Sequence, residues 1–119
     1  MAKKTITIMA DFGNGPYAWL KDSSDQSKYV GGNIADAISG FSGYAEVSRE
    51  LESKFAEWVT DFENHSDERN FDWKAFNERG IALSHRLKGE VKDAFDVVYV
   101  VQSEDPMEET GARLKITGG

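Results

Sequence analysis

The chain of 119 residues contains no cysteine, which excludes disulfide bonds, thiolate metal sites and a cysteine nucleophile. Histidine is scarce: His65 and His85 are the only two, and a specific zinc site needs several ligands at recognisable spacing. The chain also lacks a GxSxG nucleophile elbow and a Walker-type phosphate loop. We expect no metal and no cofactor. Because no acid–base pair stands out among the 21 acidic residues, a role without catalysis is favoured.

Long apolar runs are missing too, and no stretch approaches the length of a membrane-spanning helix. The opening sequence, MAKKTITIMADFG, alternates threonine with apolar residues and reaches Asp11 too early for a signal peptide. Acidic residues outnumber basic ones by 21 to 14, which gives a net charge of −7. Such a protein repels nucleic acid and anionic lipid and attracts basic surfaces. We therefore expect a cytoplasmic protein of bacterial type that binds neither nucleic acid nor membrane.

The most informative pattern lies in residues 47–62, VSRELESKFAEWVTDF. Six apolar residues recur there at helical spacing and share one side of an α-helix: Val47, Leu51, Phe55, Trp58, Val59 and Phe62. Four acidic residues fall together on the opposite side: Glu46, Glu50, Glu57 and Asp61. Ser48 is a suitable cap for the helix. The pattern predicts a helix with one buried face and one face of carboxylates.

Four other segments predict a small sheet. Residues 5–10 (TITIMA) and 17–20 (YAWL) flank a dense turn, as the two strands of a hairpin do. Residues 95–101 (FDVVYVV) form a near-continuous apolar run that is typical of a central strand. Residues 113–117 (RLKIT) alternate like an edge strand that is guarded by charge.

A second helix is predicted after the polar break at 64–70, with Asp72 as its cap. Its apolar stripe consists of Trp73, Phe76, Gly80, Leu83, Leu87 and Val91. Gly80 inside that stripe predicts a close approach to another element. Residues 34–38 (IADAI) suit a single helical turn.

These elements predict one α+β domain over residues 1–119. It has two layers: a small sheet of three or four strands, mixed or antiparallel, and two long helices on one face of that sheet. The predicted order along the chain is β-β-α-α-β-β.

The acidic helix face predicts the first of three functions. Like charges four residues apart on a helix destabilise it by roughly 0.2–0.5 kcal/mol per pair, and both Glu46/Glu50 and Glu57/Asp61 have that spacing. A basic surface docked on Glu46, Glu50, Glu57 and Asp61 would compensate for this repulsion. We therefore expect a small acidic binding module that engages a basic protein partner, as inhibitors and immunity-type proteins do. An ordinary hydrated helix face gives the same pattern.

The turn at 11–19 (DFGNGPYAW) predicts a different function. It places Asp11, Asn14, Tyr17 and Trp19 around a glycine-containing loop at the end of a strand, where binding residues often lie. A carboxylate, an amide and two aromatic rings suit a polar small molecule. The same sequence suits a hairpin turn with no ligand. The alternative function is thus an enzyme or a small-ligand binder.

The last residues, LKITGG, resemble the end of ubiquitin-like carriers, in which a strand is followed by two glycines. The resemblance implies a third function, a carrier that is joined to other molecules through Gly119. The two strands that open the chain fit the order of that family, whereas the second long helix does not. Four aromatic residues are candidates for a homodimer surface: Tyr17, Trp19, Tyr29 and Phe41.

Overall fold

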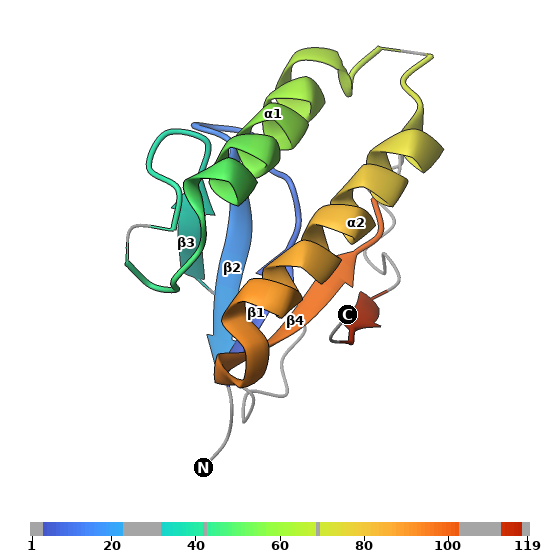
Figure 1. The fold of residues 1–119 in the computed structure, drawn as a ribbon. Coiled ribbons are helices and arrows are strands. Elements are labelled where there is room, and N and C mark those ends of the chain that lie inside the picture. The colour runs from blue at the N-terminus through green and yellow to red at the C-terminus, as the bar shows by residue number, and fades with distance from the viewer. Residues whose placement is uncertain (1–3, 23–31, 42, 69, 103–112, 118–119) are drawn as a thin grey trace.

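The computed structural model describes residues 4–22, 32–41, 43–68, 70–102 and 113–117. The elements, in chain order, are β1 (Lys4–Ile8), β2 (Pro16–Asp22), β3 (Gly32–Asp36), α1 (Arg49–His65), α2 (Trp73–Val91), a short 3₁₀ turn (Lys92–Ala94), β4 (Phe95–Val100) and β5 (Arg113–Ile116). Figure 1 shows α1 and α2 side by side on one face of the sheet. The glycine tail at 118–119 and Tyr29 lie outside the described residues.

The sheet has five strands in the order β3-β2-β1-β4-β5. The central neighbours β1 and β4 run parallel, and the other three pairs are antiparallel. The predicted α+β class, the hairpin of the first two strands and the mixed sheet are therefore confirmed. The predicted number of strands is too low, because β3 adds a fifth at one edge.

β3 forms where the sequence suggests a single helical turn at 34–38, so that prediction is wrong. A segment this short fits either structure by its pattern alone, and pairing with β2 selects the strand. The Asn33 side-chain amide strengthens the pairing by donating to the carbonyl oxygens of Ala18 (3.0 Å) and Ala35 (2.7 Å). The chain then turns at Asp36, whose Oδ1 accepts from the backbone N–H groups of Ile38 (2.9 Å) and Ser39 (2.7 Å).

α1 buries five of the six residues of the predicted apolar face, whereas Val47 precedes the helix and is half-buried. These five residues lie beneath the helix: Leu51, Phe55, Trp58, Val59 and Phe62. Aromatic rings dominate the contacts, since Trp58 stacks on Phe76 of α2 with ring centroids 4.6 Å apart and Phe55 stacks on Tyr17 of β2 at 4.8 Å. The Trp58 Nε1–H also donates to the Phe76 carbonyl oxygen at 2.9 Å. The core therefore joins both helices to the sheet.

Gly80 is the point of closest approach in this core. It is buried in α2, and a Cβ atom placed on it would lie 2.6 Å from Cζ2 of Trp58 and would also overlap the ring of Tyr99. Most of the predicted stripe is buried with it, whereas Trp73 and Leu83 are half-buried. The predicted close approach at Gly80 is confirmed, and it lets α2 lie directly against α1 and β4.

A polar network fixes α2 to the carboxyl ends of the two parallel strands. The Asn77 amide donates to the Gln102 carbonyl at 2.8 Å, and its Oδ1 accepts from the Tyr99 hydroxyl at 2.7 Å and from the Gln102 N–H at 2.9 Å. The Gln102 side chain in turn bonds both the N–H (2.9 Å) and the C=O (3.0 Å) of Ala10. The carboxyl ends of parallel strands are a frequent ligand position. In this protein the side chains of Asn77 and Gln102 join the chain segments there instead.

Candidate binding surface

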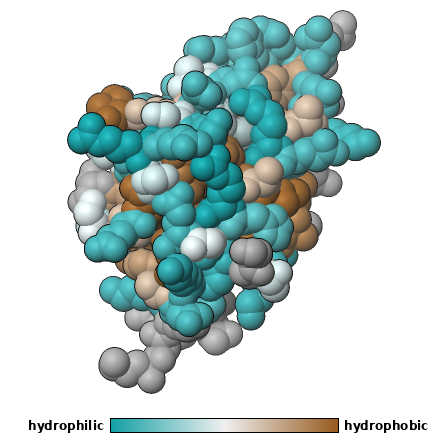
Figure 2. Space-filling model, viewed as in Figure 1, coloured by the Kyte–Doolittle hydropathy of each residue, from teal (hydrophilic) through white to brown (hydrophobic). Residues whose placement is uncertain are grey.

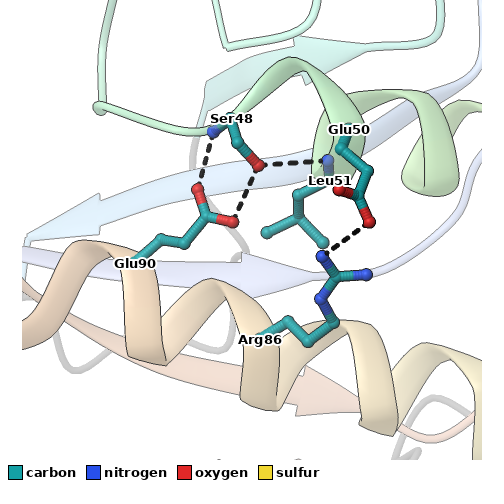
Figure 3. A network of polar contacts seen from close by, with 5 residues as sticks. All are labelled: Ser48, Glu50, Leu51, Arg86 and Glu90. Atoms are coloured by element: carbon teal, nitrogen blue, oxygen red, sulfur yellow. Dashed lines mark hydrogen bonds and ion pairs between the residues drawn. The ribbon is translucent and has the colours of Figure 1, made fainter.

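The start of α1 is anchored to the end of α2 (Figure 3). Ser48 caps α1, because its Oγ accepts from the Leu51 N–H at 3.2 Å. The Glu90 carboxylate of α2 accepts from both the N–H (2.6 Å) and the Oγ–H (2.8 Å) of Ser48. A carboxylate at a helix N-terminus is also favoured by the helix dipole. The network holds the outer face of α1 in a fixed position relative to α2.

Two of the four predicted acidic residues are paired with arginines of α2. Glu50 accepts from Arg86 at 3.2 Å, and Asp61 accepts from Arg79 at 3.2 Å. Both pairs are largely exposed, and such pairs contribute about 0–1 kcal/mol to stability. These two carboxylates therefore lean towards α2, where they meet positive charge.

The other two acidic residues are free in the part of the chain that the structure describes. Glu57 is exposed in the middle of α1, and no hydrogen bond or ion pair joins it to another described residue. Glu46 is exposed as well, but it precedes the helix, which begins at Arg49. With Lys54 exposed on the same helix, the surface carries mixed charge with Glu57 near its centre. Figure 2 shows that the helical face of the molecule is mostly hydrophilic.

The residues of the turn at 11–19 separate into surface and core. Asp11 and Asn14 are exposed, whereas Tyr17 is fully buried and Trp19 is half-buried with its Nε1–H bonded to the Met9 carbonyl at 3.0 Å. Phe41 is fully buried beside Tyr17, so these two rings belong to the core and cannot form a dimer surface. Tyr17 therefore cannot line a surface site together with Asp11 and Asn14.

The same turn is fastened to the helix layer. The Gly15 N–H donates to Oε1 of Glu63 in α1 at 2.8 Å, and the Gly15 carbonyl accepts from the Ala37 N–H at 2.9 Å. Gly15 has a φ of +65°, and a Cβ atom on it would lie 2.8 Å from that of Ala37. The glycine is thus required both by its backbone conformation and by its contacts.

Two adjoining hollows lie beside the N-terminal half of α1, and of the predicted site residues only Glu46 lines one of them, the second. The first, of about 360 Å³, lies between the turn at 36–40 and α1. The second, of about 630 Å³, continues along residues 43–48 and shares Ser39, Arg49 and Glu52 with the first. Sequence patterns miss this site because the turn and the helix meet only in the folded chain.

The first hollow is lined by the carboxylates of Asp36 and Glu52 and by Arg49. Oε2 of Glu52 accepts from the Phe41 N–H at 2.6 Å, and Oδ1 of Asp36 is used by the turn that follows β3. The Tyr17 hydroxyl is buried and has no hydrogen-bond partner among the described residues. Burial, and secondly the negative charges of Glu52 and Asp36, raise the pKa of Tyr17 far above its usual value. Tyr17 therefore stays neutral beside these two carboxylates.

A third hollow, of about 330 Å³, lies where α1 leads into α2, and Asp61, Phe71 and Arg79 are among its lining residues. His65 at its edge bonds Oε1 of Glu68 through Nδ1 at 2.7 Å. This hydrogen bond and the Glu68 charge raise the pKa of His65 above its usual value. His85, on α2, lies near the Thr117 carbonyl instead (3.3 Å).

The described ranges contain neither a metal-binding cluster nor a membrane-spanning helix. They contain no cluster of three or more histidine or acidic side chains that could hold a metal ion. Neither helix within them combines the length and hydrophobicity that crossing a membrane requires. Comparison with protein-family models, with curated proteins and with solved structures finds no match to this chain.

Proposed function

We propose that this protein is an acidic binding module that engages a basic protein partner through the outer face of α1. The observation that carries the proposal is the free carboxylate of Glu57, exposed at the middle of a helix whose opposite face is fully buried. A rigid helix presents its outer side chains without a further loss of backbone entropy on binding. The net charge of −7 would steer a basic partner towards it.

Glu46, Glu50 and Asp61 complete the proposed surface. A partner's lysines or arginines would compete with Arg86 and Arg79 for Glu50 and Asp61. The competition costs little, because exposed ion pairs are worth only about 0–1 kcal/mol each. We propose a bacterial, cytoplasmic setting for this interaction, of the kind that inhibitors and immunity-type proteins have.

Charge reversal on α1 tests the proposal. The protein is immobilised, partners are captured from a bacterial lysate at about 0.05 M salt, and the salt is then raised to about 0.5 M, where exposed charges are largely screened. We expect specific proteins to be retained at low salt, released at high salt, and lost in the double variant Glu50→Lys with Glu57→Lys. Glu78→Lys is the control, since Glu78 is exposed on α2 and outside the proposed surface. Equal retention by the double variant and the wild type would refute the proposal.

Two alternative functions stay open as proposals. A small-ligand site at the turn 11–19 would rest on Asp11, Asn14 and Trp19, because Tyr17 is buried. A carrier function would rest on Gly119, and mass spectrometry of the protein from cells would detect adducts at that residue. No contact among the described residues favours either alternative over the helix face.

A further inference from the structure

The turn between β1 and β2 contains the one asparagine of the chain that precedes a glycine, Asn14 before Gly15. The other four asparagines precede isoleucine, histidine, phenylalanine or glutamate. Asparagine is a thermolabile residue, and a following glycine makes the loss of its side-chain amide easiest, because a residue without a Cβ atom leaves its backbone nitrogen open to approach. Asn14 is exposed, and no hydrogen bond joins its side-chain amide to another described residue.

The reaction open to this pair is a cyclisation followed by hydrolysis. The Gly15 nitrogen forms a bond to Cγ of Asn14, the bond from Cγ to Nδ2 breaks, and Nδ2 leaves as ammonia with the proton of the Gly15 N–H. Water then opens the cyclic imide. Opening at Cγ yields aspartate, whereas opening at the backbone carbonyl carbon of Asn14 yields isoaspartate, in which the chain runs through Cγ.

The folded turn holds the nitrogen that would attack. The peptide group between Asn14 and Gly15 is bound at both ends. Its N–H donates to Oε1 of Glu63 in α1 at 2.8 Å, and its carbonyl oxygen accepts from the Ala37 N–H at 3.3 Å. Cyclisation requires the nitrogen to leave Glu63 and to turn towards Cγ of Asn14. The fold therefore restrains the reaction, and local opening of the turn permits it.

The space around Gly15 does not admit the isoaspartate product. A Cβ atom on Gly15 would lie 2.8 Å from that of Ala37 and 3.1 Å from Cγ1 of Val59. Isoaspartate adds one methylene group to the backbone directly before Gly15, and a close-packed site has no volume for it. A turn that has reacted in this way therefore cannot return to its position beside α1.

We propose that Asn14 and Gly15 form a self-modification site that the Glu63 contact keeps unreactive. Opening of the turn starts the conversion of Asn14 to aspartate and isoaspartate, with water as the co-reactant and ammonia as the leaving group. The conversion adds one negative charge to the exposed turn, and isoaspartate detaches the turn from α1. This inference is independent of the binding function proposed for the outer face of α1.

Timed incubation of the full chain at mildly alkaline pH tests the inference. The tryptic peptide of residues 5–21 contains Asn14 as its one asparagine, so mass spectrometry of that peptide records the replacement of NH₂ by OH, and fragmentation distinguishes isoaspartate from aspartate. We expect Glu63→Ala to accelerate the conversion in the folded protein by about three- to tenfold, the effect of losing one hydrogen bond. Glu63→Gln keeps an oxygen acceptor, so its rate should lie between those of Glu63→Ala and the wild type.

Gly80→Ala is the control for global unfolding. It disturbs the contact of α2 with Trp58 but leaves the hydrogen bond between Gly15 and Glu63 in place. We expect the rate at Asn14 to be unchanged in this variant, whereas the chain unfolded in denaturant should react faster than any folded variant. The amide NMR spectrum of each variant shows whether it is folded.

Three results would overturn the inference. The first is a conversion rate at Asn14 that is the same in folded Glu63→Ala as in the wild type, or no conversion at all. The second is a slower rate in both Glu63 variants, which would mean that the carboxylate takes the proton of the Gly15 N–H instead of restraining the turn. The third is an equal acceleration by Gly80→Ala, which would place the reaction in the globally unfolded chain.

Discussion

At the scale of single residues, Gly80 controls how closely the helices and the sheet approach. Trp58 and Tyr99 occupy the space that a Cβ atom would need, and both are buried. We expect Gly80→Ala to lower the free energy of unfolding by about 1–3 kcal/mol, because rings in a packed core must shift. Denaturant unfolding followed by tryptophan fluorescence measures the change.

Gly89 is the matched control for that substitution. It lies in the same helix, is exposed, and has no heavy atom within 4 Å of the position that a Cβ atom would take. Gly89→Ala is expected to raise stability by up to about 1 kcal/mol, because alanine favours the helical backbone. If both substitutions raised stability, the close contact at Gly80 would be wrong.

His65 provides a prediction about pH. Its hydrogen bond to Glu68 raises the pKa of His65 above the usual value near 6.5, so the protonated ring is favoured in the folded state. The stabilisation is complete below the unfolded pKa and is lost as the pH rises through the folded pKa. An NMR titration of the His65 imidazole should show a pKa above that usual value. Glu68→Gln should lower that pKa, and an unchanged value would contradict the contact.

At the scale of elements, the junction of α1 with α2 depends on Ser48 and Glu90. Ser48→Ala removes the helix cap and one hydrogen bond to Glu90, so we expect a loss of about 1 kcal/mol. Glu90→Gln removes the charge at the helix N-terminus and should cost roughly 0.3–1 kcal/mol. Because the two side chains touch, the double variant should lose less than the sum of the single losses.

Ser53→Ala is the control for this junction. Ser53 is exposed within α1, and no hydrogen bond joins its side chain to another described residue. Alanine favours the helix more than serine does, so the stability should stay equal or rise slightly. The same unfolding experiment measures the double variant. If its loss of stability equalled the sum of the two single losses, the side chains of Ser48 and Glu90 would not be energetically coupled.

At the scale of the whole molecule, the sheet predicts an order of backbone stability. β1 and β4 each pair with strands on both sides, whereas β3 and β5 lie at the edges. Amides that open only with global unfolding exchange most slowly with solvent. We expect the slowest hydrogen exchange at the central residues of β1 and β4 and the fastest strand exchange in β3 and β5. Equal protection in β5 and β1 would contradict the strand order.

The sequence determined most of the elements. The spacing of Leu51, Phe55 and Val59 predicts α1 and its buried face, and the run at 95–101 predicts β4, because each pattern is a local repeat that matches one backbone geometry. β3 was missed, since its few residues gain strand structure only through pairing with β2. Tyr17 is predicted both to begin a strand and to be a candidate ligand residue. The structure confirms the strand, but it buries the ring under α1, where β2 and β3 shift register.

The predicted acidic residues were located on or beside α1, but their partners were not. Arg79 and Arg86 lie in a distant part of the sequence, and only the packing of the two helices brings them to Asp61 and Glu50. The same holds for the hollow, where Asp36 and Glu52 come from separate elements. Periodicity and composition thus decided which segments are helices and strands and what net charge the surface carries. Tertiary structure decided which charges are neutralised and which remain available, because charge pairing depends on distance in space.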